Sequence, residues 1–575
     1  MQLGQGLRVI NTQLGFRNRH GAKRIIVPDL PETVSIFGSR LFMVFEQNDF
    51  SKYGLNDPAQ LPFTHRAGLE RQHTDFGTWL VGDFSHVDRT GVYQAICGNE
   101  PGPSFAIRDD VYLRVLPECL RYFQVQSCGR SVPGWHPSCH LDDGYIVEED
   151  RYLDAAGGWH DAGDFRKWAT STALNAIALL IGHRLWSGRE EQLGLAPGVL
   201  LDEAMQGVHY FLNIQHESGA LYHNIGGGRD TWHDNLDCRY TDNVKHSGDE
   251  RRIWPEPGAR PAGKFTALYA MYAHALAGRD GALSERCLAA AKRSLEFDLG
   301  THSHSADALQ WRAWAYLELW RATGEGDYQA AAVRTLDALL DLQVTDYVGG
   351  QRAVRGWFRD MADSDQMHRK HVGWEVACWV LAEATTCWAD HEKAGRWRDA
   401  LAMWVEDFVE PFARRNPFGI LPYALYHRPP AENPHTHYRR LGDELYFRYF
   451  LRCKHMSNAR YSLAAAALAG TAGVLQTHRN RCLDHAYRLL EWTLGNNPFQ
   501  LSTMNGVGVI QPCALAFQTG NIPGGVTLGI GGDDQDMPCY PHPFACSDEY
   551  YGYQTSHFTW ALLALQNVEY AGDER

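Results

Sequence analysis

The sequence lacks a long apolar run, an excess of basic residues and any low-complexity tract. Its longest apolar stretch, ALNAIALLIG at residues 173–182, is about half a membrane span, so no membrane-spanning segment is predicted. The net charge of -14, without a run of Lys and Arg, argues against a nucleic-acid or membrane-surface partner. The prolines and glycines are scattered, so no long disordered segment is expected.

Two further absences bear on the cellular compartment. The opening MQLGQGLRVINTQLGF has no charged start followed by an apolar stretch, so no signal peptide is predicted. The expected location is therefore cytoplasmic, and a trimmed sequence of a secreted protein is the alternative. The 13 cysteines show no repeating disulfide spacing, which favours free thiols and metal ligands over bridges. No feature of the sequence specifies an oligomeric state.

The sequence divides into a β-rich part and a helix-rich part. Residues 1–107 carry short β-branched and aromatic runs separated by Gly, Pro, Asn and Asp, which predicts a small β-sandwich of the immunoglobulin type. In residues 108–575, roughly a dozen segments have apolar residues at i, i+3, i+4 and i+7, in consecutive pairs that often end near Gly. Helices are predicted over residues 110–129, 170–187, 199–215, 263–278, 281–299, 308–324, 327–343, 372–388, 395–412, 458–476, 479–495 and 555–572.

The helical territory is expected to form one barrel. Many of its segments are rich in Ala and apolar over a broad face, which predicts burial on more than one side. Inner and outer rings of paired helices satisfy that pattern, so the expected fold is mainly α, with an (α/α)6 barrel over residues 108–575. A helical solenoid is the alternative, but no fixed-period repeat supports it.

The stretch GGWHDAGDFRKW, residues 157–168, places two aspartates three positions apart. Asp161 and Asp164 could belong to a plain surface turn, since Asp and Gly are ordinary turn residues. The other interpretation is a pair of carboxylates that handles a water molecule. The pair lies in a loop just before a predicted helix, and loops at one rim of a barrel are a usual place for chemistry.

Together with other segments, this stretch resembles glycoside hydrolase family 9, in the branch with an N-terminal immunoglobulin-like domain. The resemblance extends over nearly the whole chain, and it implies an inverting hydrolysis of a β-linked saccharide. Within DAGD it implies Asp164 as the general base and Asp161 as a holder of the attacking water. The segments that carry the resemblance include VINTQLGF, DFSHVDRTGVYQA, LLDEAMQGVHYFLNIQ, GALYHNIG, NPFGILP, MSNARYSLAAAALA and LGNNPFQLSTMNGVG.

Inversion also needs an acid on the other face of the sugar, because the two aspartates serve one face. The resemblance nominates Glu549, within ACSDEYYGYQTSHF ahead of the last predicted helix. The alternative is that Asp548 and Glu549 merely solvate a loop end. Trp314 matches a family tryptophan that lines the cleft. The alternative is that Trp314 packs in the hydrophobic core, since it lies on an Ala-rich helix.

The resemblance implies an oligosaccharide or polysaccharide substrate that is glucan-like or built of amino sugars, with endo- or exo-type cleavage. The His-His-Arg-like segment of the best-known members is replaced by QTGNIPGGVTLGIGGDDQDMPCYPHPF, which bears on substrate identity more than on reaction type. Two competing functions are another saccharide-active helical toroid, such as a phosphorylase or lyase, and a non-catalytic sugar-binding protein.

Cysteine and histidine gather close to the aspartate pair. Cys128, Cys139, His140 and His160 offer two thiolates and two imidazoles, a suitable tetrahedral set for structural zinc. Some members of the same branch bind zinc through a similar set. His160 directly precedes Asp161, so it would hold the aspartate loop in place. A disulfide between the two cysteines, or free cysteines beside unrelated histidines, are the alternatives, and His136 is a spare ligand.

An acidic run near the C-terminus is the second metal hypothesis. Asp533, Asp534 and Asp536, in GGDDQDMP, could bind calcium through their carboxylate oxygens. A solvated loop is the alternative.

Overall fold

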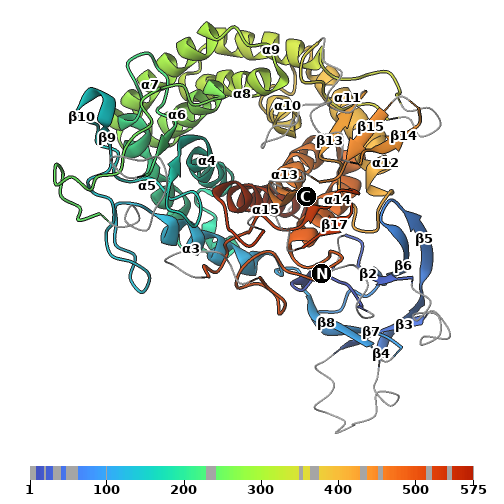
Figure 1. The fold of residues 1–575 in the computed structure, drawn as a ribbon. Helices are drawn as coiled ribbons and strands as arrows, with labels where there is room; N and C mark the ends of the chain where they lie inside the picture. The colour runs from blue at the N-terminus through green and yellow to red at the C-terminus, as the bar shows by residue number, and fades with distance from the viewer. Residues whose placement is uncertain are drawn as a thin grey trace.

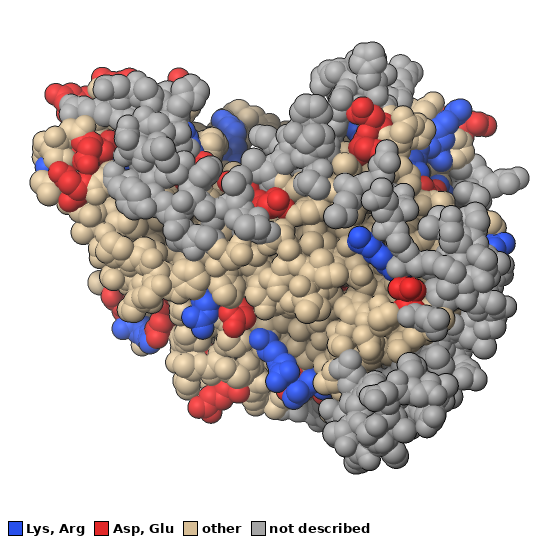
Figure 2. All heavy atoms as spheres, turned by 60° about the horizontal axis from the view of Figure 1, so that its bottom comes forward, with Lys and Arg blue, Asp and Glu red and all other residues tan. Residues whose placement is uncertain are grey.

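A computed structural model shows a β-rich N-terminal part beside a ring of helices (Figure 1). No described helix is long and apolar enough to cross a membrane. Among the described residues on the face in Figure 2, Lys and Arg are scattered between acidic and uncharged residues and do not gather into a basic stripe. The structure describes residues 8–18, 21–29, 41–46, 63–98, 100–227, 241–348, 354–362, 375–427, 437–443, 445–450, 457–512, 521–540 and 547–573.

The N-terminal part is a two-sheet sandwich. One sheet has the order β1-β8-β7-β3-β4 and the other has the order β2-β6-β5. Buried side chains from both sheets, among them Leu80, Tyr93 and Phe105, form a hydrophobic core separate from that of the helices, which confirms the predicted small β-sandwich. The strands are β1 (Gly15–Phe16), β2 (Arg24–Pro28), β3 (Leu41–Glu46), β4 (Phe63–Gly68), β5 (Glu70–Thr74), β6 (Gly77–Asp83), β7 (Gly91–Cys97) and β8 (Glu100–Ile107).

Three strands of the sandwich, β1, β4 and β5, lie outside the β-branched and aromatic runs from which strands were predicted. β5 reads ERQHT and lies at the edge of its sheet, paired only with β6 among the described strands. Its side chains are largely exposed, so it carries no alternating apolar signal. β4, FTHRAG, is likewise at a sheet edge.

Six helices form a closed inner ring. Each packs against the next, and the last, α15, packs against the first, α4 (Figure 1). Residues 169–182 and 457–469 are buried without interruption, because an inner helix is covered by the outer helices on one side and by its ring neighbours on the others. The inner helices are α4 (Ala169–Trp186), α6 (Ala262–Leu276), α8 (Ala306–Thr323), α10 (Glu375–Cys387), α13 (Ser457–Val474) and α15 (Gly552–Asp573).

The outer helices pack onto this ring and complete the pairs. α7 shows their character: it buries a stripe that includes Leu283, Cys287 and Leu295 and exposes its charged face. The two rings confirm the predicted (α/α)6 barrel. The outer helices are α3 (Leu116–Gln126), α5 (Val199–Asn213), α7 (Gly281–Gly300), α9 (Gly326–Leu340), α11 (Ala394–Trp404) and α14 (Arg479–Thr493).

The helix predicted over residues 395–412 is interrupted. After α11, residues Val405–Val409 form a π-helical turn, and α12 (Glu410–Ala413) follows. Pro411 explains the change, because proline has no N–H and its ring clashes with the carbonyl four residues earlier. That carbonyl, of Asp407, instead accepts a 3.2 Å hydrogen bond from the amide of Arg355.

Short paired strands lie in the loops between the helices. Most of them join segments that are adjacent in sequence, but β11 and β12 link the loop before α4 to the loop after α5. These strands are β9 (Tyr145–Ile146), β10 (Arg151–Tyr152), β11 (Lys167–Trp168), β12 (Asn224–Ile225), β13 (Ala424–Tyr426), β14 (Arg439–Leu441), β15 (Leu445–Arg448), β16 (Gly531–Gly532) and β17 (Pro538–Cys539).

The sandwich docks firmly on the barrel. The Trp79 ring meets Phe418 edge-on with ring centroids 5.4 Å apart, and Arg415 forms a 2.8 Å ion pair with Asp75. The last strand of the sandwich ends at Ile107 and the first barrel helix begins at Leu116. The boundary predicted after residue 107 lies next to this junction and stays a prediction.

Candidate active site

The loop that carries the two aspartates is held by its own backbone. The amide of Asp161 donates a 2.9 Å hydrogen bond to the carbonyl of Arg166, which closes a compact turn. Phe165 within this turn has a φ of 65°, in the left-handed region. The preceding His160 amide donates a 2.8 Å hydrogen bond to the Gln126 carbonyl of α3. The turn therefore has one defined shape, just before β11 and α4.

Asp161 is fully buried, and its carboxylate oxygens make no close hydrogen bond among the described residues, although an interaction with the Tyr551 hydroxyl lowers its pKa. Burial raises its pKa well above the ordinary value, and the negative charges of Asp164 and Glu549 raise it further. The carboxyl predicted near the C-terminus thus acts electrostatically on the aspartate loop, about 390 residues earlier in the chain.

Asp164 differs from Asp161 in its access to solvent. Its side chain is 31% exposed, and the Arg166 amide donates a 3.3 Å hydrogen bond to Oδ1. The Arg166 guanidinium lies 3.9 Å from Oδ2, at the outer limit of an ion pair. A carboxylate in this position can contact a solvent molecule, and its charge acts on the buried Asp161.

Glu549 lies in the segment that leads into α15. The carbonyl of Glu549 accepts a 2.8 Å hydrogen bond from the Leu528 amide, and Tyr550 is buried edge-on against Tyr122. Tyr551 pairs with Ala162 of the aspartate loop in an isolated antiparallel bridge. Because α15 and α4 are neighbours in the inner ring, the segments before them meet at one end of the barrel.

Tyr551 is the residue on which the three carboxyl groups converge. The charge of Asp161 raises the pKa of its hydroxyl most, burial follows, and Asp164 and Glu549 raise it further. The structure thus brings together the three acids that the sequence analysis singled out. In the sequence, Tyr551 stood out only as an aromatic neighbour of Glu549 that could desolvate it.

The structure corrects the hypothesis that Trp314 contacts a sugar. The indole is fully buried, stacks on Trp311 with ring centroids 5.2 Å apart, and donates a 2.8 Å hydrogen bond to Glu318. Glu318 in turn forms ion pairs with Arg184 and Arg321. Trp314 therefore packs within the helix ring, because a polar network of α4 and α8 holds its only polar atom.

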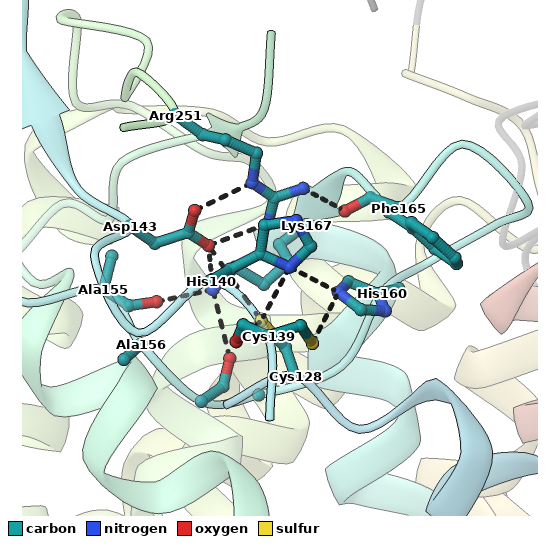
Figure 3. Close-up of polar contacts among 12 residues, drawn as sticks. Cys128, Cys139, His140, Asp143, Ala155, Ala156, His160, Phe165, Lys167 and Arg251 are labelled. Atoms are coloured by element: carbon teal, nitrogen blue, oxygen red, sulfur yellow. Dashed lines mark hydrogen bonds and ion pairs between the residues drawn. The ribbon is translucent and has the colours of Figure 1, made fainter. Parts of the chain in front are cut away.

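The four predicted metal ligands meet at one point (Figure 3). Their ligand atoms all lie within 4.8 Å of one another: the His140 and His160 nitrogens are 3.3 Å apart, and Cys128 Sγ is 3.9 Å from His140 Nδ1. Cys139 Sγ is 4.0 Å from His160 Nε2. These residues form a group that could hold a metal ion.

The ionisation of Cys139 and His160 matches what a metal requires. Both cysteines are free of disulfide bonds. A hydrogen bond with Cys128 lowers the pKa of the Cys139 thiol to about 5, and burial lowers the pKa of His160 to about 4. A thiolate and a neutral imidazole are the ligand forms that bind metals. His136 stands outside the group, since both of its ring nitrogens contact backbone carbonyls.

A buried ion-pair network, which the sequence analysis missed, surrounds the ligands. Asp143 contacts Arg251 through two 2.7 Å hydrogen bonds and Lys167 at 2.7 Å (Figure 3). Burial alone would raise the pKa of Asp143, but the charges of Arg251 and Lys167 outweigh it and lower the pKa. Arg251 also donates a 2.6 Å hydrogen bond to the Phe165 carbonyl. The network therefore links the metal-ligand group to the aspartate loop.

The acidic run near the C-terminus does not form the predicted calcium site. Asp536 is fully buried, pairs with Arg439 at 2.9 Å, and accepts hydrogen bonds from the amides of Tyr449 and Phe450. One carboxylate oxygen of Asp533 caps its own turn by accepting from the amides of residues 535 and 537. An arginine therefore occupies the place where a cation would be needed.

Comparisons with known proteins agree with this geometry. Endoglucanase D of Acetivibrio thermocellus is 26% identical over 286 residues, 44% of this chain and 44% of that protein. A cellodextrinase of Butyrivibrio fibrisolvens is 25% identical over 162 residues, 25% of this chain and 29% of that protein. The chain thus matches less than half the length of either relative.

A solved structure extends the likeness to the whole fold. The crystal structure of a metagenome-derived glycoside hydrolase family 9 endoglucanase superposes with a TM-score of 0.72 at 19% identity, covering 98% of this chain and 99% of that one. The sequence profile of glycosyl hydrolase family 9 matches residues 112–515, which is more than half of the chain. The chain belongs to glycosyl hydrolase family 9.

Proposed function

We propose that the protein is an inverting glycoside hydrolase that cleaves β-linked glucan-like or amino-sugar oligosaccharides. Family membership and the three gathered carboxyl groups support the reaction type. The cellodextrinase and endoglucanase relatives favour glucan-like chains of the cellodextrin kind. Endo- and exo-type cleavage are both compatible with the three acids.

The observation that carries the proposal is the state of Asp161. A buried carboxylate without hydrogen-bond partners is costly, by roughly 1–3 kcal/mol or more, and a bound water is the usual remedy. Both oxygens of Asp161 are buried and make no close hydrogen bond among the described residues, and only the Tyr551 hydroxyl interacts with the carboxylate as a side-chain hydrogen-bond donor there. A water held there would lie close to Asp164, the more exposed acid.

The proposed reaction divides the work among the three acids. Asp161 orients the water, and Asp164 accepts a proton from it as the water oxygen bonds to the anomeric carbon. Glu549 gives its proton to the glycosidic oxygen as the bond from that oxygen to the anomeric carbon breaks. Attack and departure take place on opposite faces of the sugar, so the configuration at the anomeric carbon inverts.

Repulsion among the negative charges of the three carboxyl groups favours a protonated carboxyl in the site. Carboxyl groups that interact strongly share protons and titrate as a unit. Burial and two neighbouring negative charges raise the pKa of Asp161. Burial and these two charges therefore favour a proton on Asp161 at a pH at which isolated carboxyls are ionised.

The test is the configuration of the first-formed product. Cello- and chito-oligosaccharides are hydrolysed in phosphate-free buffer inside an NMR tube, and the anomeric protons are followed before mutarotation sets in. We expect the α-anomer first, at a rate that added phosphate does not change. The β-anomer first, turnover that depends on phosphate, or no hydrolysis of any β-linked sugar would contradict the proposal. Product sizes separate endo from exo cleavage.

We further propose that Cys128, Cys139, His140 and His160 hold zinc. With Zn–S near ~2.3 Å and Zn–N near ~2.0 Å, ligand atoms of a tetrahedral site lie about 3.3–3.8 Å apart. The observed His–His separation of 3.3 Å lies in this range, and the two Cys–His separations of 3.9 and 4.0 Å lie just above it. The four protein ligands leave no open position, so the ion would be structural.

Zinc at this place would brace the site without entering the reaction. His160 would be both a ligand and the residue before Asp161, so the ion would anchor one end of the aspartate turn. Arg251, through its 2.6 Å hydrogen bond to the Phe165 carbonyl, anchors the other end. A general base needs this restraint because a small displacement degrades in-line attack.

A further inference from the structure

A large pocket lies where the sandwich docks on the barrel, between β2, β5 and β6 on one side and α12 and α14 on the other (Figure 1). Its volume of about 820 Å³ is within the range of small-molecule sites. The described residues that line it include none of the three proposed catalytic acids. We call it the junction pocket.

Two arginines reach the junction pocket from its opposite walls. Arg24 belongs to β2 and Arg488 to α14. The Arg24 side chain makes no hydrogen bond or ion pair among the described residues, and Arg488 donates only a 3.3 Å hydrogen bond to the Pro417 carbonyl. Glu70 and Asp83 also line the pocket, but neither forms an ion pair with these arginines. Two guanidinium groups therefore face one pocket without an anionic partner.

The Arg488 guanidinium is held in place before any ligand arrives. It lies flat against Gly419, which has a φ of 72°, and a Cβ at that position would come within 2.6 Å of Arg488 Cζ. Glycine leaves the room that the guanidinium fills, and the Pro417 carbonyl holds one of its nitrogens. A donor that is already oriented loses less conformational freedom on binding a ligand.

The charges around the pocket are not balanced. Burial lowers the pKa of Arg488 to about 10, and the positive charge of Arg24 contributes to this, because two nearby acids of α14 do not outweigh it. The neighbouring His485 has its pKa lowered to about 4, first by burial and then by Arg488, with Arg24 and Arg414 adding to it. The wall of the pocket therefore carries an excess of positive charge.

We propose that the junction pocket binds a phosphate group between Arg24 and Arg488. The planar guanidinium fork matches the oxygens of a phosphate and donates two hydrogen bonds to it. The pocket is larger than a free phosphate requires. Glu70 and Gln72 of β5 line the remaining space and offer hydrogen-bonding groups for hydroxyls. A free phosphate and a small phosphorylated sugar share the chemistry that this site recognises.

The bound group would fasten the sandwich to the barrel. Arg24 belongs to the first and Arg488 to the second, so without an anion their like charges repel across the junction. A phosphate between them turns this repulsion into attraction from both sides. Because it binds the folded protein, it should raise stability in proportion to its concentration.

Isothermal titration calorimetry on the full-length protein at low ionic strength tests the site. The probes are inorganic phosphate, glucose 6-phosphate and glucose, and glucose reports any binding in the sugar-cleaving site. Tighter binding of glucose 6-phosphate than of the other two would support a phosphorylated sugar as the ligand. Binding of inorganic phosphate at least as tight as that of the ester would support free phosphate. No binding of inorganic phosphate, together with equal binding of glucose and its 6-phosphate, would overturn the proposal.

Substitutions assign the binding to this pocket. Arg24→Gln breaks no bond among the described residues, and Arg488→Lys keeps the charge but loses the fork. Each should weaken phosphate affinity by roughly tenfold or more, since each removes charge-assisted hydrogen bonds. Arg71→Gln is the matched control, because this arginine of β5 pairs with Asp29 and does not line the pocket. Unchanged affinity in Arg24→Gln would refute the assignment.

Thermal unfolding measures the consequence for the junction. Phosphate should raise the Tm of the parent protein and of Arg71→Gln equally, and it should leave that of Arg24→Gln unchanged. The rate of cello-oligosaccharide hydrolysis should be the same with and without phosphate, because the pocket contains none of the proposed catalytic acids. A Tm of the parent protein that phosphate does not raise would contradict a ligand that fastens the sandwich to the barrel.

Discussion

The amide of Gly552 donates a 2.6 Å hydrogen bond to the carbonyl of Asp161. This bond joins the first residue of α15 to the aspartate turn, and the bridge between Ala162 and Tyr551 reinforces it. Three residues before Gly552 stands Glu549. The backbone itself therefore sets the spacing between the proposed acid and the proposed base, and the side chains need only adopt suitable rotamers.

Glu549→Gln tests the general acid. We expect the hydrolysis rate on cello-oligosaccharides to fall about 10²–10⁴-fold, because the leaving oxygen then departs without a proton. On a 2,4-dinitrophenyl β-cellobioside the loss should be much smaller, because this leaving group needs no proton. Glu217→Gln, at an exposed position, is the control and should match the parent protein. An equal loss on both substrates would argue against Glu549 as the acid.

Asp164→Ala tests the general base. Hydrolysis should fall by a similar 10²–10⁴-fold, since the water loses the group that accepts its proton. Azide is nucleophilic without deprotonation, so it should restore cleavage and give the α-glycosyl azide, identified by NMR. A β-glycosyl azide would show that azide attacks from the side of the leaving group, which would contradict the role of Asp164 as the base for the water. Full activity without azide would remove Asp164 from the mechanism.

Asp161→Asn separates positioning from proton transfer through the pH profile. The profile of kcat/KM should be bell-shaped, because the base must be ionised and the acid protonated. Removing one of three mutually repelling charges lets the remaining carboxyls lose protons at lower pH, so the alkaline limb should move down by about 1 pH unit. Unchanged limbs with a reduced rate would show that Asp161 does not couple to the other acids.

Cys139→Ser tests the zinc proposal. Zinc measured by elemental analysis should fall from about one per chain toward zero, and the Tm should drop by several degrees, because metal binding energy contributes to folding. Cys539→Ser, a partly exposed cysteine outside the ligand group, is the control and should retain the metal. Full zinc content in Cys139→Ser would disprove the ligand set.

The substitution Glu491→Gln should increase the stability of the fold in a pH-dependent way. Burial, followed by the charge of Asp484, raises the pKa of Glu491 from 4.5 to about 8. Below about pH 4.5 the group is protonated in both folded and unfolded chains, so it does not change stability there. Between pH 4.5 and 8 the unfolded chain releases the proton and the folded chain keeps it, which destabilises the fold by up to ~1.4 kcal/mol per pH unit.

The glutamine variant should therefore have a higher Tm than the parent protein at pH 8, and the difference should shrink toward pH 4.5. Thermal unfolding followed by circular dichroism at several pH values measures it. The opposite trend would mean that Glu491 is ionised and favourably paired in the folded protein.

Helices and the acids of the aspartate loop were predictable because their signals are local. An inner helix such as α13 is rich in Ala and buried along most of its length, and DAGD is a short motif between glycines. The edge strand β5 was not predictable, because its exposed polar residues are held by pairing with β6 rather than by an apolar pattern. Trp314 was misassigned because an indole that contacts Glu318 reads in sequence like one that faces a ligand.

The ion pairs of Asp143 were likewise not predictable from the sequence. Lys167 and Arg251 stand 24 and 108 residues away from it in the chain, and nothing in the local pattern distinguishes them from surface charges. Likewise, Asp536 looked like a calcium ligand until the fold brought Arg439 to it from nearly 100 residues earlier. Which segments pack together decides whether a charged side chain is buried and which partner it pairs with. The sequence around each charged residue does not show this.

The sequence by itself determined the helix periods, the short β runs, the paired aspartates and the Cys and His residues, because each depends on neighbours within one turn or one loop. Only the tertiary structure decided that the charge of Glu549 acts on Asp161, that Trp314 is core, and that Asp143 pairs with Lys167 and Arg251. Closure of the inner ring places α15 against α4. The contact between the two ends of the barrel chain follows from that closure.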